Sequence, residues 1–260
     1  MSKPTAIFVD VDYTLLSHTQ RKIPDSAKDA LFYARDKGAK VFVATGRHEH
    51  ELEKVPELPT LPIDGFVTLN GALCSVGGEV IYTNPLSESV IAQVVKRLEE
   101  SLFPCMFCDA KGMFISMVTD LVCQLQESLQ LPLPPVRPPK AALDTEVLQI
   151  VTFGKVEEEF FLSIDGVNLT TWLGSGFDVV SSTANKWDGI LHVCKHLGLN
   201  PADVATIGDA DNDKEMLLGA GYSVAMGNAE EHVKACAKFV TDHIDEDGFA
   251  KAIDYLFKKT

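Results

Sequence analysis

Short apolar runs alternate with amphipathic segments along the first 83 residues of the chain. The runs at 6–10, 40–46 and 64–72 are typical of buried strands, and 25–38 has the apolar spacing of a helix face that ends at Gly38. Strands that are apolar throughout and separated by helices are typical of a parallel sheet covered on both faces. This part of the chain therefore predicts a doubly wound α/β fold.

The pattern changes between residues 84 and 183, where helices mix with hairpins. We predict helices at 88–102, 121–130 and 156–164, hairpins at 105–118 and 169–182, a strand at 147–154 and an extended proline-rich connector at 131–140. This mixture indicates an α+β module with an antiparallel sheet.

The first pattern returns near residue 184. Helices are predicted at 186–199, 213–221, 229–237 and 248–259, and strands at 203–209 and 222–226. We therefore predict one doubly wound domain made of residues 1–83 and 184–260, split by an inserted α+β domain at 84–183.

Polar side chains follow several of the predicted core strands. Asp10 and Asp12 follow the first strand, Thr45 follows the second, and Asp209 follows the strand that begins at residue 203. Because ligands of open α/β sheets bind at the carboxyl ends of strands, we expect these residues to meet in one cleft. Carboxylates crowded in this way repel one another unless a cation lies among them, and hard oxygen ligands favour Mg²⁺. The same crowding beside Asp10 should raise the pKa of Asp12.

The composition narrows the expected partners and location. The chain of 260 residues has a formal net charge of −14, which repels nucleic acid and anionic membrane surfaces, so we expect neither as a partner. It contains no run of 18 apolar residues and no secretory leader pattern. Its six cysteines are scattered, as is typical of free thiols in a reducing compartment, and we expect a cytoplasmic protein.

Seven pieces of sequence, spread in order over both core segments, carry a family resemblance. They are "DVDYTLL" (10–16), "VATGR" (43–47), "LNGA" (69–72), Lys186, "IGDADNDKEM" (207–216), "AMGNA" (225–229) and "IDEDGFAKAI" (244–253). With them the chain resembles the haloacid dehalogenase (HAD) superfamily phosphatases, specifically the Cof-like branch with an inserted α/β (C2-type) cap. The resemblance implies that residues 84–183 form a cap that closes over the active site and sets specificity, with hinges at 82–85 and 181–185.

The resemblance also implies a role for each carboxylate. Asp10 would be the nucleophile that forms an aspartyl-phosphate, and Asp12 would protonate the leaving oxygen and then activate water. Asp10, the backbone carbonyl of Asp12 and Asp209 would bind Mg²⁺. Asp213 would lie outside the metal ligands and orient Lys186 or a metal-bound water.

Further residues are implied to hold the phosphoryl group and the substrate. The phosphate-binding groups would be Thr45, Lys186, Asn212 and the backbone of Val11 and Gly46, and the candidate substrate contacts are Arg47, Asn70, Gly71 and the cap segments 108–114 and 172–178. Tyr13 and Trp187 stand where the family usually has glycine, a difference that bears on how substrate fits.

The predicted function is Mg²⁺-dependent hydrolysis of a small phosphorylated metabolite, with sugar phosphates the leading class, by a monomer or small homo-oligomer. A phosphomutase and a non-catalytic HAD-like binding or regulatory protein are the alternatives. Asp211 is expected to be solvated. Pairs with metal-ligand spacing occur at His192/His196 and Cys105/Cys108, but no further ligand follows, so we expect packing or surface histidines and free thiols.

Overall fold

The computed structural model describes residues 3–155, 157–172 and 176–258. The chain divides into two compact units, which are considered one at a time below. The first unit consists of Met1–Tyr82 and Asn185–Thr260, and the second consists of Thr83–Ala184.

The first unit is built on an eight-stranded sheet with the order β13-β12-β11-β1-β2-β3-β4-β5. Its strands are β1 (Ala6–Val9), β2 (Lys40–Ala44), β3 (Gly65–Thr68), β4 (Leu73–Val76), β5 (Glu79–Thr83), β11 (Val204–Gly208), β12 (Tyr222–Ala225) and β13 (Phe239–Val240). The pairs from β13 to β3 are parallel, whereas β4 runs antiparallel to β3. The predicted doubly wound α/β fold is confirmed.

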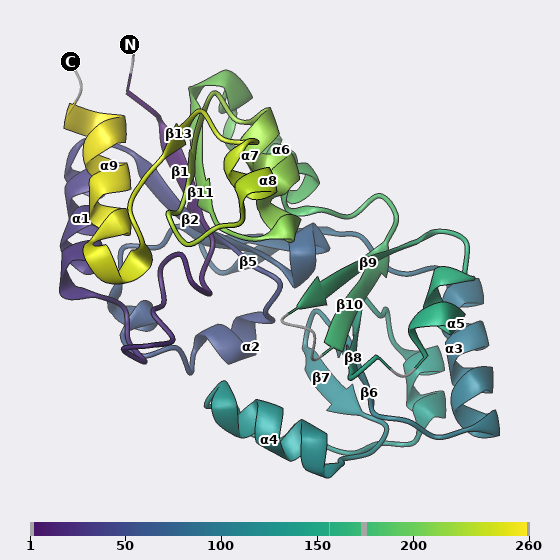
Figure 1. The fold of residues 1–260 in the computed structure, drawn as a ribbon. Coiled ribbons are helices and arrows are strands. Elements are labelled where there is room, and N and C mark those ends of the chain that lie inside the picture. Colours follow the sequence, from purple (N-terminus) through teal and green to yellow (C-terminus); the bar gives the residue numbers. More distant parts are fainter. Residues whose placement is uncertain (1–2, 156, 173–175, 259–260) are drawn as a thin grey trace. The chain divides into compact units, whose positions relative to one another are not determined.

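Helices cover both faces of this sheet, as Figure 1 shows. They are α1 (Asp25–Asp36), α2 (Glu49–Leu52), α6 (Lys186–Leu197), α7 (Lys214–Gly219), α8 (Glu231–Lys234) and α9 (Gly248–Lys258). Alternate residues of β1 supply the two apolar layers: Ile7 packs in the cluster that includes α1 and α9, and Phe8 packs in the one that includes α6. Both faces of β1 are therefore buried, which explains its unbroken apolar sequence.

One hairpin of this unit was missed, and two predicted helices differ in their bounds. The hairpin of β4 and β5 was not predicted, although Gly77 and Gly78 at its turn both have positive φ, and such glycine pairs are a hairpin signal. The helix predicted at 213–221 begins as a 3₁₀ turn over Asp211–Asp213, and the one predicted at 229–237 is a single turn, Glu231–Lys234. Short, weakly amphipathic stretches such as these lack the length that makes a periodic pattern reliable.

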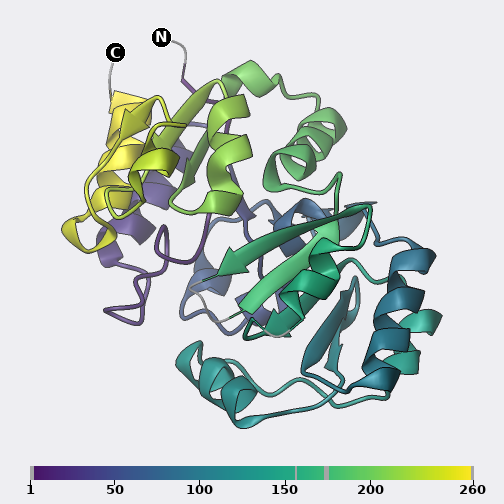
Figure 2. The ribbon, with the colours of Figure 1, turned by 45° about the vertical axis from the view of Figure 1, so that its right-hand side comes forward.

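The second unit is a five-stranded sheet with the order β7-β6-β8-β10-β9, in which the described pairs are antiparallel. Its elements are α3 (Glu88–Glu100), β6 (Cys105–Asp109), β7 (Gly112–Ile115), α4 (Asp120–Ser128), β8 (Gln149–Phe153), α5 (Glu158–Leu162), β9 (Val167–Trp172) and β10 (Gly176–Ser181). Its core joins one face of this sheet to α3 and α5 through side chains such as Phe107, Val94 and Phe161. Figure 2 shows the same unit from a second direction.

The proline-rich stretch 131–140 is more ordered than the predicted connector. Ile115 N–H donates to the carbonyl of Pro135, and Arg137 N–H donates to the carbonyl of Ile115, each at 3.0 Å. The stretch then enters a 3₁₀ helix, Pro139–Asp144. A proline has no N–H to donate to a sheet, but its carbonyl and the N–H of a nearby residue can still bond to an edge strand.

Within the described residues, no helix is long and apolar enough to cross a membrane.

Candidate active site

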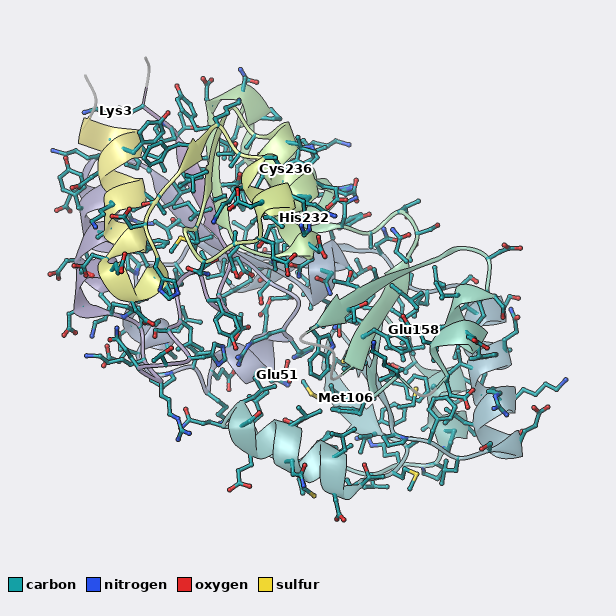
Figure 3. All side chains as sticks on the ribbon, viewed as in Figure 1. Lys3, Glu51, Met106, Glu158, His232 and Cys236 are labelled. Carbon is teal, nitrogen blue, oxygen red and sulfur yellow. The ribbon has the colours of Figure 1, made fainter. Side chains whose placement is uncertain are left out.

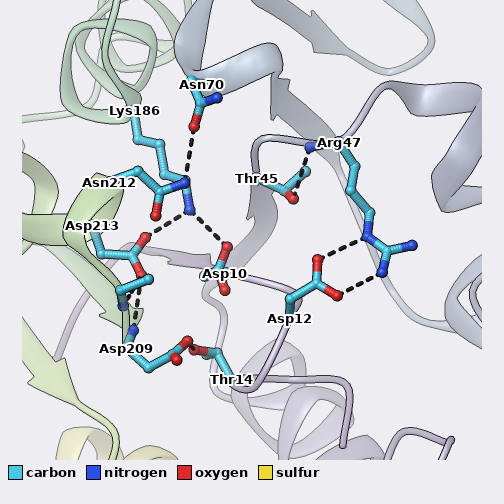
Figure 4. Close-up of polar contacts among 11 residues, drawn as sticks. Asp10, Asp12, Thr14, Thr45, Arg47, Asn70, Lys186, Asp209, Asn212 and Asp213 are labelled. Atoms are coloured by element: carbon cyan, nitrogen blue, oxygen red, sulfur yellow. Dashed lines mark hydrogen bonds and ion pairs between the residues drawn. The ribbon is translucent and has the colours of Figure 1, made fainter. Parts of the chain in front are cut away.

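Three neighbouring parallel strands of the first unit end at the same edge of the sheet and bring polar residues together. Asp10 follows β1, Thr45 follows β2 and Asp209 follows β11. The ladder continues one residue past the strands, because Asp10 N–H donates to Ile207 O at 3.0 Å and Thr45 N–H donates to Val67 O at 2.8 Å. Figure 4 shows the resulting group of side chains.

Lys186 joins this group from the first turn of α6. Its ammonium donates to Oδ1 of Asp10 and to Oδ1 of Asp213, each at 2.7 Å, and its side chain is 0% exposed. The helix starts here because the side chain of Asn185 accepts from the N–H of Asp188 and caps it. Although burial alone would lower the pKa of Lys186, the two carboxylates outweigh it and raise that pKa well above its usual value, so the lysine is a cation.

Asp213 organises the loop after β11. While its Oδ1 holds Lys186, its Oδ2 accepts from the backbone N–H groups of Asp209 at 2.8 Å and Ala210 at 2.9 Å. The side chain is fully buried. Both of its oxygens are thus engaged in holding other parts of the site, which is the arrangement expected of a residue that orients Lys186.

An acidic cluster forms where these residues meet. One oxygen each of Asp10, Asp209 and Asp213 lies within 4.8 Å of the others. Burial raises the pKa of Asp10 well above its usual value, and the charges of Asp213 and Asp209 add to this while Lys186 opposes it. Burial and the charge of Asp213 raise the pKa of Asp209 to about 7. Carboxylate oxygens at such distances suit a hard divalent cation, and since both oxygens of Asp213 already bind Lys186 and the backbone, Asp10 and Asp209 are the candidate ligands.

The carboxylate of Asp12 lies in a different environment from that of Asp10. Arg47 donates to it through Nε, at 2.8 Å to Oδ2, and through Nη2, at 2.6 Å to Oδ1. His18 Nε2 lies 2.6 Å from the same Oδ1. Burial raises the pKa of Asp12, but Arg47 and His18 outweigh burial and hold that pKa well below its usual range. The predicted upward shift was therefore wrong, because Asp12 is paired with cationic and hydrogen-bonding partners and not mainly crowded by Asp10.

Arg47 is placed by the short helix that follows it. Glu51 on α2, labelled in Figure 3, accepts from the N–H of His48 at 2.9 Å and closes the first turn directly after Arg47. The N–H of Arg47 itself donates to Oγ1 of Thr45 at 3.2 Å. Arg47, which was predicted as a substrate contact, is thus bonded to Asp12 in this structure.

The segment after β3 forms a left-handed turn beside these residues. Leu69, Asn70 and Gly71 all have positive φ, which is rare for the first two. The N–H of Asn70 donates to the carbonyl of Thr45 at 3.1 Å, and its Oδ1 accepts from Nδ2 of Asn212 at 2.9 Å. A Cβ on Gly71 would lie 2.0 Å from the carbonyl oxygen of Asn185, so this glycine lets the turn pack against the start of α6.

Three residues of the site were not singled out from the sequence. Thr14 donates to Oδ1 of Asp209 at 2.7 Å, and His18 bonds to Asp12. Asn228 donates to the carbonyl of Tyr13 at 2.9 Å and accepts from the N–H of Ile244 at 3.1 Å. Thr14 and Asn228 lie inside quoted motifs, so their position was a usable signal, whereas nothing in the sequence marks His18.

Among the other residues considered from the sequence, Asp211 and His192 of the first unit contact partners outside this group. Asp211 is largely exposed, as expected, and it also pairs with His232 at 2.6 Å (His232 is labelled in Figure 3) and with Lys214 at 2.9 Å. His192 stacks on Tyr82 with ring centroids 3.5 Å apart, a packing role. All six cysteines are free. Of the predicted segment 172–178, residues 173–175 lie outside the described residues.

Comparisons with known proteins agree with this geometry. The family profile described as haloacid dehalogenase-like hydrolase matches residues 7–253. The Bacillus subtilis (strain 168) protein named "Putative phosphatase YkrA" is 32% identical over 253 residues, which is 96% of each chain. The solved structure of the HAD subclass IIB sugar phosphatase BT4131 is 34% identical, covers 96% of this chain and 98% of its own, and superimposes with a TM-score of 0.86.

A second solved structure comes from work on a trigonal-bipyramidal intermediate in a phosphoryl-transfer superfamily. It is 33% identical, covers 97% of this chain and 98% of its own, and has a TM-score of 0.90. The match extends over nearly the whole chain in sequence and in structure. The chain therefore belongs to the haloacid dehalogenase-like hydrolase family and is a phosphatase.

Proposed function

We propose that this phosphatase hydrolyses small phosphorylated metabolites, with sugar phosphates the leading class, through an aspartyl-phosphate and with Mg²⁺ bound. The observation that carries the proposal is the position of Asp10, a buried carboxylate at a strand end whose Oδ1 is held 2.7 Å from the ammonium of Lys186. The sugar-phosphate class is supported by the similarity to BT4131, which is a sugar phosphatase.

In the first step, the free oxygen of the Asp10 carboxylate forms a bond to phosphorus. The bond between phosphorus and the leaving oxygen breaks, its electron pair stays on that oxygen, and the proton comes from Asp12. In the second step, water attacks phosphorus, Asp12 takes its proton, and phosphate departs from Asp10. The ionised state that Arg47 and His18 favour for Asp12 suits the second step, and the first step requires that Asp12 be protonated beforehand.

The surrounding groups would bind and orient the phosphoryl oxygens. We assign this role to Lys186, Thr45, Asn212 and the backbone of Val11 and Gly46. Lys186 is already fixed as a cation between two carboxylates, and preorganised charge of this kind supplies most of the rate enhancement in phosphoryl transfer.

Mg²⁺ would be held by Asp10, Asp209 and the backbone carbonyl of Asp12, with Asp213 behind them. When bound, the ion neutralises negative charge on the phosphoryl oxygens. The fit rests on the chemistry of the donors: buried carboxylates with raised pKa values are stabilised in their ionised form once a cation lies among them.

We further propose that residues 84–183 act as the specificity domain, with hinges at 82–85 and 181–185. The contacts of the second unit support one detail: Asn84 Nδ2 donates to Oγ1 of Thr183 at 3.0 Å, so both connections are tied together inside that unit. The segments 108–114 and 172–178 stay our candidates for contacting the leaving group.

The test is a phosphate-release screen across phosphorylated metabolites with Mg²⁺ present, run beside Asp10→Asn. We expect stoichiometric phosphate release from one or more monoesters by the wild type and none by the variant. Release of phosphate at a similar rate by Asp10→Asn would contradict the nucleophile assignment. Conversion of one phosphate ester into another without phosphate release would indicate a mutase.

A further inference from the structure

The loop after Asp12 folds back so that a histidine six positions along the chain reaches its carboxylate. Tyr13 N–H donates to Leu16 O at 3.0 Å, and Leu16 N–H donates to Val11 O at 2.7 Å. Ser17 and Lys22 then bond to each other in both directions, at 3.0 and 3.2 Å. The backbone on either side of His18 is therefore anchored by bonds that do not involve the imidazole.

The side chain of Ser17, next to His18, also ties the loop to Asp245. Oγ of Ser17 donates to Oδ1 of Asp245 at 2.5 Å, and the N–H of Gln20 donates back to that same Oγ at 3.0 Å. His18 thus projects from a fixed support, with its Nε2 placed 2.6 Å from Oδ1 of Asp12. While the carboxylate of Asp12 is ionised it can only accept, so Nε2 is the donor of this bond in that state.

The ring of His18 is held on its flat face as well. It stacks on Tyr13, with ring centroids 4.4 Å apart and an angle of 25° between the planes. Tyr13 itself has φ 60, a left-handed conformation that favours glycine and costs a side chain strain. The side chain at this strained position thus makes a ring contact with His18 that glycine could not make.

The bond to His18 adds a further restraint to a carboxylate that Arg47 already holds. The side chain of Asp12 is 31% exposed, and Arg47 and His18 together donate three hydrogen bonds to it. Arg47 fixes the plane of the carboxylate from one side. His18 bonds to Oδ1 from a loop that is anchored independently of Arg47, and this bond limits the remaining rotation of the Asp12 carboxylate.

We propose that His18, supported by the ring of Tyr13, is a positioning residue that holds Asp12 in the orientation for proton transfer at the leaving oxygen. This inference rests on the proposed function of Asp12. An acid must lie within hydrogen-bond reach and in line with the atom it protonates, and small displacements are costly to the rate. His18 touches neither substrate nor the reacting atoms in this role and acts only through Asp12.

The role has a signature that a purely structural residue would lack. Breaking the bond from phosphorus to an alkyl oxygen leaves a strongly basic oxygen that needs the proton of Asp12, whereas p-nitrophenolate is a weak base that leaves without it. The value of kcat/KM reports the steps up to departure of the leaving group, so dephosphorylation of Asp10 does not mask the effect. Loss of positioning should therefore lower kcat/KM selectively for alkyl phosphates.

The experiment compares kcat/KM for glycerol 2-phosphate and p-nitrophenyl phosphate, with Mg²⁺, in the full-length protein. We expect His18→Ala to lose about 10-fold or more on the alkyl substrate and little on the aryl one. His18→Gln, which keeps an N–H at nearly the same reach, should recover part of the loss. His196→Ala, on the exposed face of α6, is the matched histidine control and should match the wild type on both substrates.

Tyr13 is tested with a pair of variants that share its backbone penalty. Tyr13→Phe keeps the ring on His18, whereas Tyr13→Ala removes it at the same positive φ. The ratio of kcat/KM for the alkyl substrate to that for the aryl substrate should therefore fall in Tyr13→Ala and not in Tyr13→Phe. Thermal unfolding of each variant identifies any that is misfolded. If His18→Ala is misfolded, the kcat/KM values of His18→Gln and of the two Tyr13 variants test the positioning role instead.

Asp12→Ala separates this inference from the function on which it rests. If Asp12→Ala shows the selective loss and His18→Ala does not, the positioning role is wrong and the proposed function stands. If Asp12→Ala loses activity equally on both substrates, Asp12 is not the acid, and the role of His18 falls with it. Equal losses on both substrates in His18→Ala, with selective loss in Asp12→Ala, would also overturn the positioning role.

Discussion

Replacing Lys186 with methionine should destabilise the first unit strongly. Methionine fills nearly the same volume but carries no charge, so the substitution leaves Asp10 and Asp213 without the cation that lies 2.7 Å from each. Removing one partner of a buried ion pair costs about 3–5 kcal/mol, because an uncompensated charge stays in the interior. With oxygens of three carboxylates within 4.8 Å of one another, we expect Lys186→Met to lower the free energy of unfolding by about that amount in EDTA.

The measurement can be confined to the unit that contains the site. The chain has two tryptophans, Trp172 in the second unit and Trp187 in the first. In a Trp172→Phe background, the fluorescence of Trp187, which packs in the apolar layer around α6, follows unfolding of the first unit in urea. The midpoint and slope of that transition give the free energy of unfolding for each variant.

Two comparisons make the reasoning refutable. Lys251 pairs with Asp242 on the surface of the first unit with its side chain 52% exposed, and Lys251→Met should leave the free energy of unfolding close to that of the wild type. Adding Asp10→Asn to Lys186→Met should restore part of the lost stability, because it removes one of the unpaired charges. A Lys186→Met protein within about 1 kcal/mol of the wild type in EDTA would show that the site does not depend on this cation.

Three further results are expected. Asp10→Asn should abolish phosphate release and leave the thermal midpoint equal or higher, since it relieves charge crowding; a clearly lower midpoint would contradict that cause. EDTA should abolish turnover and Mg²⁺ should restore it and raise the thermal midpoint, whereas activity in EDTA would refute the metal assignment. Asn228→Ala should cost about 1–3 kcal/mol by removing the side-chain partner of two partly buried backbone groups, more than Asn200→Ala at an exposed turn.

The parts of the site that depend on strand ends and helix starts could be predicted from the sequence. Asp10, Thr45 and Asp209 follow apolar runs, and parallel strands bring such positions to one edge. Lys186 stands at a helix start that Asn185 caps. The regular geometry of the elements, and not a long-range contact, decides where these residues lie.

The parts that depend on how a loop turns could not be predicted. Nothing in the sequence says that His18 reaches Asp12, because that contact needs the chain to reverse twice between them. The bond from Arg47 to Asp12 was missed for the same reason, since the single turn of α2 sets the direction of the Arg47 side chain. The upward pKa shift expected for Asp12 was wrong for the same reason, because the turns that bring Arg47 and His18 to its carboxylate are not visible in the sequence.

The different environments of Asp10 and Asp12 also bear on how many cations the site needs. Asp12 carries one negative charge, which the guanidinium of Arg47 already neutralises through two hydrogen bonds. The cluster of Asp10, Asp209 and Asp213 contains three carboxylates against the single ammonium of Lys186, which leaves two negative charges when all are ionised. One divalent ion cancels that excess, whereas a monovalent ion would not. This balance supports our proposal of a single Mg²⁺ beside Asp10. The carboxylate charges add to burial in raising the pKa values of Asp10 and Asp209, whereas Arg47 and His18 outweigh burial and lower that of Asp12.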